Sequence, residues 1–107
     1  LPLATDDQTV YATDLDGQVV AVNAASGEIL WRQTGLKFRF PSGPIATGAG
    51  IMVVDSLGVG HLLDTQNGAF IGRLKTGLSG TISLTAIEQD VLAMDNSGRL
   101  IRVGINN

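Results

Sequence analysis

A repeat of about 40 residues runs through this chain, and it constrains the fold more than any other feature. The segment Val10–Gly17 reads Val-Tyr-Ala-Thr-Asp-Leu-Asp-Gly, and Ile51–Gly58 carries a similar pattern 41 residues later. A third copy, Val91–Gly98, follows after a further 40 residues. Because the spacing holds over three copies, the chain is built from repeated structural units that pack against their neighbours.

Each unit contains short strands separated by tight turns. Every copy has an aspartate followed three residues later by a glycine: Asp14 and Gly17, Asp55 and Gly58, Asp95 and Gly98. The aspartate can accept hydrogen bonds from the backbone ahead of it, and the glycine tolerates a positive φ. In the first two units, Gly27 and Gly68 mark the next connection. These residues are therefore predicted to shape turns.

Runs of four to six β-branched and apolar residues lie between the turns and are too short for helices. We predict strands at 2–5, 10–14, 18–23, 28–33, 44–47, 51–55, 59–64, 69–75, 82–87, 91–95 and 99–103. Several of these runs are continuously apolar, which indicates strands covered on both faces. Four such strands in about 40 residues are typical of a β-propeller blade.

The predicted fold class is therefore all-β, a segment of a β-propeller made of four-stranded antiparallel blades. Residues 1–107 form a single segment, with units at 2–41, 42–81 and 82–107. The last unit ends before its outer strand, so the chain holds about two and three-quarter blades. Propellers close with about four blades or more, and the sequence is thus expected to be part of a larger propeller.

Composition excludes several classes of function. The chain has no cysteine and one histidine, which excludes thiolate zinc sites, disulfide frameworks and cysteine nucleophiles. Its net charge of −3 and its lack of a basic stripe argue against a nucleic-acid partner. The longest apolar runs are four residues, whereas a membrane-spanning helix needs about 20. No catalytic residue, cofactor-binding residue or metal ligand is predicted.

The segment from Val10 to Trp31 resembles the quinoprotein-type propeller repeat, which carries a Val-Tyr-Ala strand, an Asp-Gly turn and a closing tryptophan. The stretches 42–45, 54–64, 67–72 and 95–103 are similar to the C-terminal end of the BamB family, lipoprotein scaffolds of the outer-membrane β-barrel assembly machinery. The second unit departs from the repeat, because Gly72 stands at the position of Trp31.

This resemblance implies an eight-bladed, non-catalytic propeller that assists the insertion of β-barrel proteins. It implies partners in the periplasmic domains of the barrel-inserting subunit and a location at the periplasmic face of the Gram-negative outer membrane. A lipid anchor would belong to an N-terminus that this chain does not contain. No cofactor is implied, and no partner-binding residue of the family maps onto this chain.

A quinone (PQQ)-dependent dehydrogenase, or another periplasmic binding or sensor protein with the same repeat, is the alternative. Such dehydrogenases bind a quinone and a calcium ion on the propeller axis. Asp14 and Asp16 could suggest a calcium pair, but the further ligands of a calcium loop do not follow them. Turn formation is therefore the preferred role of these two aspartates.

Two single residues have structural interpretations. His61 lies in the middle of a predicted strand with no second ligand or nucleophile near it in the sequence, so it is expected to pack or form hydrogen bonds between blades. The resemblance implies that Trp31 docks on the adjacent blade, where its indole N–H would bond to a backbone carbonyl.

The segment Phe38-Arg39-Phe40 is the candidate partner-binding site. It lies in the connection between the first two units, where a polar loop is expected. Aromatic residues and arginine are enriched at interaction hot spots, although the two rings could instead cover the end of a blade. If the segment contacts a partner, Arg39→Glu should weaken binding and leave the thermal midpoint of unfolding unchanged.

The third unit leads to a prediction about association. Its last predicted strand, 99–103, lacks an outer neighbour and should present an unpaired backbone edge, and the terminal blades should expose apolar faces. The isolated chain is therefore expected to self-associate in light scattering at micromolar concentration. A stable, monodisperse monomer of 11.1 kDa would contradict the blade assignment or show that three units close by themselves.

Overall fold

The computed structural model describes residues 3–6 and 8–105, which form strands, turns and bends without a helix. The strands are β1 (Leu3–Asp6), β2 (Thr9–Thr13), β3 (Val19–Asn23), β4 (Ile29–Gln33), β5 (Ile45–Thr47), β6 (Gly50–Val54), β7 (Val59–Leu63), β8 (Phe70–Lys75), β9 (Ile82–Ile87), β10 (Asp90–Asp95) and β11 (Leu100–Val103). The all-β prediction is confirmed, and the predicted strands match these to within one or two residues. Positions 2, 7, 106 and 107 of the predicted units lie outside the described residues.

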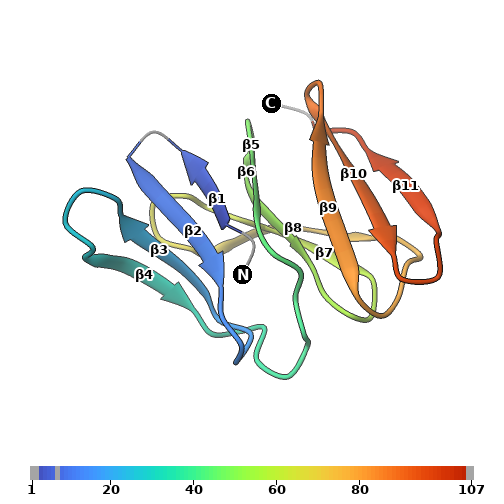
Figure 1. The fold of residues 1–107 in the computed structure, drawn as a ribbon, viewed down its shortest axis with the longest axis horizontal. Helices are drawn as coiled ribbons and strands as arrows, with labels where there is room; N and C mark the ends of the chain where they lie inside the picture. Colours follow the sequence, from blue (N-terminus) through green and yellow to red (C-terminus); the bar gives the residue numbers. More distant parts are fainter. Residues whose placement is uncertain (1–2, 7, 106–107) are drawn as a thin grey trace.

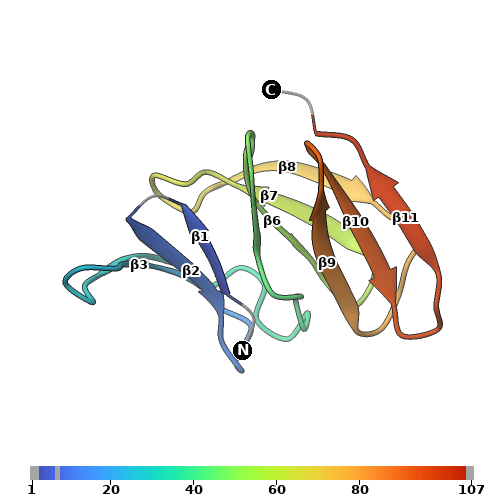
Figure 2. The same ribbon diagram turned by 45° about the horizontal axis from the view of Figure 1, so that its top comes forward.

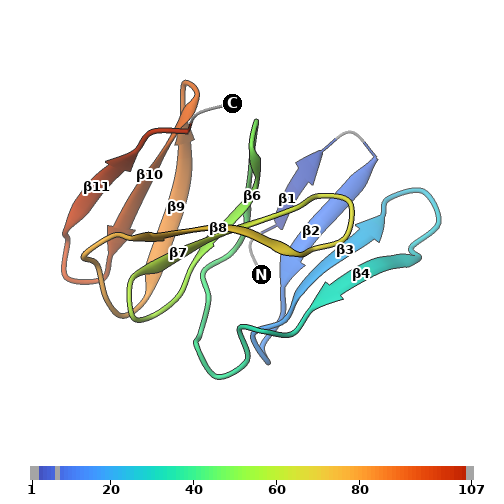
Figure 3. The ribbon, with the colours of Figure 1, turned by 180° about the vertical axis from the view of Figure 1, so that it is seen from behind.

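The described strands form three antiparallel sheets in chain order: β1 to β4, β5 to β8, and β9 to β11. Figure 1 shows the three sheets next to one another, with the first and third on either side of the second. After a turn of the view, they remain separate layers (Figure 2). From behind, β4 and β8 are seen as the last strands of their sheets (Figure 3). This stacking of small twisted sheets is the arrangement of propeller blades.

The pairing register repeats between the first two sheets. Within each sheet every strand pairs with the next strand of the chain. The register shifts once in each outer pair, at Ala21 and Val22 between β3 and β4, and at Leu62 and Leu63 between β7 and β8. Equivalent positions of the sequence repeat therefore occupy equivalent positions in the two sheets.

The position of β6 between two other sheets explains why its sequence is continuously apolar. All five of its residues are buried. Ile51 and Val53 belong to the hydrophobic cluster between the first and second sheets, whereas Met52 and Val54 belong to the cluster between the second and third. Because successive side chains of a strand point to opposite faces, a strand covered on both faces has no position for an exposed polar residue.

The turns between β2 and β3, β6 and β7, and β10 and β11 share one backbone conformation. Gly17, Gly58 and Gly98 have φ angles of 85°, 84° and 91°, in the left-handed region. They differ in their surroundings. A Cβ on Gly58 would lie 2.0 Å from the Leu78 carbonyl oxygen, whereas a Cβ on Gly98 would have no atom within 4 Å.

This difference leads to a stability prediction for alanine substitutions. Gly98→Ala should cost about 1 kcal/mol for the left-handed backbone alone. Gly58→Ala should cost about 1–3 kcal/mol more, because the added methyl group overlaps the Leu78 carbonyl. Gly48→Ala, in the exposed turn between β5 and β6, serves as the control and should cost least. Urea unfolding measures all three, and equal losses at Gly58 and Gly98 would contradict the contact.

Candidate functional site

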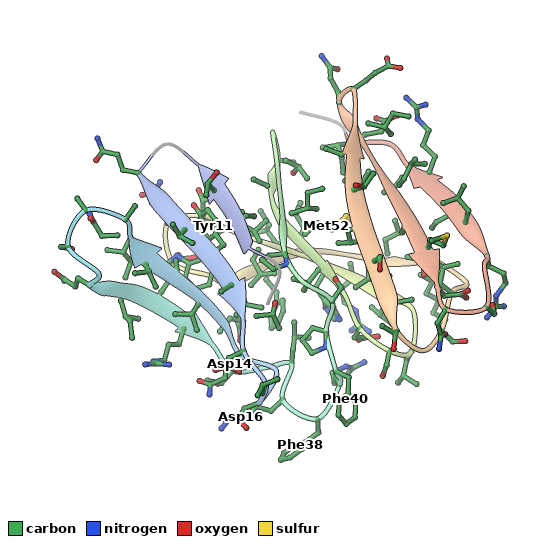
Figure 4. The ribbon with its side chains drawn as sticks, viewed as in Figure 1. Tyr11, Asp14, Asp16, Phe38, Phe40 and Met52 are labelled. Atoms are coloured by element: carbon green, nitrogen blue, oxygen red, sulfur yellow. The ribbon has the colours of Figure 1, made fainter. Side chains whose placement is uncertain are left out.

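The candidate site lies at the end of the sheets where the three aspartate turns meet the connections between blades. A cavity of about 840 Å³ opens there. It is lined by the turn between β2 and β3, by residues 37–38 and 40–43 of the first connection, by residues 80–82 of the second, and by Ser56 and Asn96 from the other two turns. Figure 4 shows Asp14, Asp16, Phe38 and Phe40 together at this end of the molecule. We call this region the turn face.

Three aspartates build the turns of this face in the same way. The Oδ1 atom of Asp14 accepts hydrogen bonds from the amides two and four residues ahead, at 2.9 and 3.0 Å. Asp55 accepts the equivalent pair from Leu57 and Val59, both at 3.0 Å. Asp95 accepts the pair from Ser97 and Arg99, also at 3.0 Å. In each unit, one carboxylate oxygen is therefore used by the backbone of its own turn.

The second carboxylate oxygen differs between the units. The Oδ2 atom of Asp55 accepts from Arg39 Nε at 3.0 Å and lies 2.9 Å from His61 Nε2. Asp95 is paired instead with Arg99, whose Nε lies 2.9 Å from Oδ2. For Asp14 no cation partner is found among the described residues. Both ion pairs therefore reach a connection between blades, because Arg39 itself lies in the first connection and Arg99 donates to Ser79 in the second.

Asp55 is fully buried, and its ionisation depends on these contacts. Burial by itself raises the pKa of a carboxyl group. The hydrogen bonds from His61, from the Val59 and Leu57 amides and from Arg39 outweigh that effect and hold the pKa of Asp55 below its ordinary value. The site therefore contains a buried carboxylate that stays charged because it is completely bonded.

The connection between β4 and β5 places its two aromatic rings outward. Phe38 and Phe40 have φ angles of 67° and 52°, values that are rare for a bulky residue. Their side chains are 88% and 75% exposed. The intervening Arg39 turns inward to Asp55, and its carbonyl accepts from the amide and the hydroxyl of Ser56. Strain of this kind persists only where the surrounding contacts fix the backbone, and here Arg39 supplies them.

The structure therefore separates the three residues that the sequence places together. The predicted partner-binding rings of Phe38 and Phe40 lie on the turn face, but Arg39 is a half-buried partner of Asp55. This contact changes the expectation for Arg39→Glu, which should lower the thermal midpoint because the substitution would set a second carboxylate against a buried one. Nothing in the spacing of Arg39 and Asp55, 16 residues apart, indicates this contact.

Three of the remaining predicted residues, Trp31, Gly68 and His61, lie between the sheets. Trp31 is buried on the turn between β7 and β8, and its Nε1 donates to the Thr65 carbonyl at 2.9 Å. Gly68 is in contact with the indole ring. His61 is buried beside Phe70, with 5.5 Å between the ring centroids. Gly27, in the exposed turn between β3 and β4, has a φ of 76°.

Two features are absent from the part of the chain that the structure describes. No group of three or more histidine, cysteine, aspartate or glutamate side chains is placed to hold a metal ion. Among residues 3–6 and 8–105, no helix has the length and apolar character needed to cross a membrane.

The stacked sheets, the repeated register and the aspartate turns define this chain as a segment of a β-propeller. Comparison with known proteins then gives the family. The chain matches the family model described as "Outer membrane protein assembly factor BamB" over residues 1–107. It belongs to the BamB family.

Individual relatives agree with this assignment. A protein named "Outer membrane protein assembly factor BamB" from Kangiella koreensis is 33% identical over 99 residues, which are 90% of this chain and 25% of the relative. A protein of the same name from Legionella pneumophila is 29% identical over 97 residues, again 25% of its length. The crystal structure of BamB from Moraxella catarrhalis has a TM-score of 0.89 and 34% identity, covering 98% of this chain and 32% of that one. The chain spans about a quarter of the length of these two curated relatives.

The Asp55 network leads to a prediction about acid stability. Because the pKa of Asp55 is lower in the folded chain than in the unfolded chain, its contribution is present above about pH 4 and is lost as the pH falls through the folded value. The free energy of unfolding should therefore fall as the pH drops below about 4, and Asp55→Asn should reduce this dependence.

The matched control for this prediction is Asp14→Asn in the equivalent turn. At pH 7, Asp55→Ala should cost about 3 kcal/mol, because it leaves His61 and two turn amides without their partner. Asp14→Ala removes turn bonds alone and should cost about 1 kcal/mol. Urea unfolding curves across this pH range measure both quantities, and equal costs would show that the ion pair adds no stability.

Proposed function

We propose that this chain is part of a scaffold in outer-membrane protein assembly, and that its turn face contacts another protein of that assembly. The observation that supports the proposal most directly is the outward display of Phe38 and Phe40 on a connection fixed by Arg39. Family membership gives the setting, because the relatives are named as outer-membrane protein assembly factors. Display of strained aromatic residues in solvent has no benefit for folding, which favours a role in binding.

The turn face has the composition of an interaction surface. Besides the two phenylalanines, Leu15 is 90% exposed and Leu57 is 73% exposed, each in an aspartate turn of this face. Asp16 and Lys37 add charges of both signs to the same cavity. Exposed aromatic and aliphatic groups with a polar rim are characteristic of transient interfaces. The turn face is thus suited to a partner with an apolar patch of its own.

The partner that we propose is a periplasmic domain of the barrel-inserting subunit of the assembly complex. The full-length protein would act at the periplasmic face of the outer membrane, held there by an N-terminal lipid. The BamB family name supports membership of the complex, and the choice of subunit is the part that needs a test.

We also propose that the scaffold has no catalytic role. The aspartates that could have formed a calcium site in a quinone-dependent dehydrogenase are used by the turns, where Asp14, Asp55 and Asp95 each accept two backbone amides. His61, the single histidine, is bonded to Asp55 inside the molecule. Because the turn aspartates and His61 already have these structural partners, a structural role is favoured for the side chains on which catalysis would depend.

Substitution of the two phenylalanines tests the proposed surface. Phe38→Asn and Phe40→Asn remove the rings, and asparagine accepts a left-handed φ better than most residues. In the full-length protein, the double variant should bind the periplasmic domains at least about tenfold more weakly, as expected for loss of an aromatic hot spot. Its thermal midpoint should be unchanged or slightly higher.

The control for this experiment is Leu30→Asn, which removes an exposed apolar side chain from the outer strand β4 and not from the turn face. It should leave binding unchanged. Isothermal titration calorimetry measures the affinities, and unimpaired binding by the double variant would remove the turn face from the proposal.

A further inference from the structure

The junction between the first two sheets is filled by an indole ring. Trp31 is 8% exposed, and its ring centroid lies 6.0 Å from that of Tyr11. A Cβ on Gly68 would lie 2.4 Å from the ring, so the ring rests directly on that backbone. The Thr65 carbonyl accepts the indole N–H. This junction therefore combines an apolar slot with one hydrogen-bond acceptor.

The positions of Tyr11 and Trp31 recur at the junction between the second and third sheets, but without the indole, whereas the counterpart of Gly68 lies outside the described residues. Across the first sheet, Tyr11 pairs with Ala21 and Ala21 pairs with Trp31. Across the second sheet, Met52 pairs with Leu62 and Leu62 pairs with Gly72. Figure 4 shows Tyr11 and Met52 in the first and second junctions, respectively. Gly72 thus occupies the place from which an indole fills the first junction.

The carbonyl acceptor also has a counterpart. Thr65 lies two residues after the last residue of β7, and Ile105 lies two residues after the last residue of β11. Strands β7 and β11 are equivalent, because each follows an aspartate turn of the same conformation. Ile105 therefore holds the position of Thr65 in the repeat, and it lines the second junction.

A cavity of about 180 Å³ is present at this second junction. Its walls include Met52, Leu62, Gly72, Val103 and Ile105, and the lining is mainly apolar. Leu62 is larger than its counterpart Ala21 and fills part of the space that the missing ring leaves. The remaining volume is large enough for a small aromatic molecule, since an apolar cavity of roughly 150 Å³ accepts benzene.

We propose that this cavity binds a small, neutral, planar aromatic molecule of the indole type. The ring would lie between Met52 and the backbone of Gly72, where the side chain of Trp31 lies in the first junction. The ligand is a free ring and not a peptide tryptophan, because the backbone of β8 already occupies the position from which a chain would carry the ring. This site is separate from the turn face and does not depend on the proposed function.

Titration of the full-length protein with indole, followed by NMR, tests this site directly. Saturable shifts are expected at the Met52 methyl group and at Leu62 and Val103, with a dissociation constant in roughly the millimolar range for so small a ligand. N-acetyltryptophanamide should bind at least several-fold more weakly, because its backbone has no room. Equal binding of both compounds would overturn the assignment to a free ring.

A pair of substitutions at one position provides the control. Gly72→Trp supplies the missing ring from β8 and should reduce indole binding at least tenfold. Gly72→Ala should keep binding within about threefold, since a Cβ there makes an ordinary 3.5 Å contact with Leu62. If Gly72→Trp does not fold, Ala49→Phe at the wall of the cavity should produce the same loss. Absence of saturable shifts in the unsubstituted chain, or unchanged binding in the blocked variant, would overturn the proposal.

Discussion

Alternate side chains of β6 enter two different hydrophobic clusters, and this two-sided burial holds the three sheets together. Ile51 and Val53 pack toward the first sheet, and Met52 and Val54 pack toward the third. The free energy gained by burying apolar surface is proportional to the buried area and has little directional preference. It can therefore hold stacked sheets together without special geometry at their ends. The turns and connections at those ends are therefore free to carry residues that the core does not need.

The turn face depends on a buried charge in the same central sheet. One oxygen of Asp55 shapes its own turn, and the other binds Arg39 and His61. A buried carboxylate is costly unless it is bonded, so the carboxylate and the connection that carries Arg39 stabilise each other. The exposed positions of Phe38 and Phe40 follow from that internal contact.

The candidate site could be predicted only in part. The sequence identifies Phe38 and Phe40 as unusual residues for a connection, but it gives no indication that Arg39 points the opposite way. The reason is local: a left-handed φ at phenylalanine is rare and has no sequence signal of its own. The replacement of tryptophan by Gly72 is visible in the sequence, whereas the cavity beside it depends on how much space Leu62 fills.

The sequence by itself determined the repeat, the positions of the strands and the turns that end in glycine. These features follow from interactions within one sheet, between residues that are near one another in the chain, so the pattern of apolar residues and turn residues contains them. Only the tertiary structure decided which side chains meet between sheets. The contacts of Trp31 with Thr65 and of Arg39 with Asp55 join residues 34 and 16 positions apart. The packing of whole sheets brings these residues together, and a local sequence pattern does not indicate how whole sheets pack.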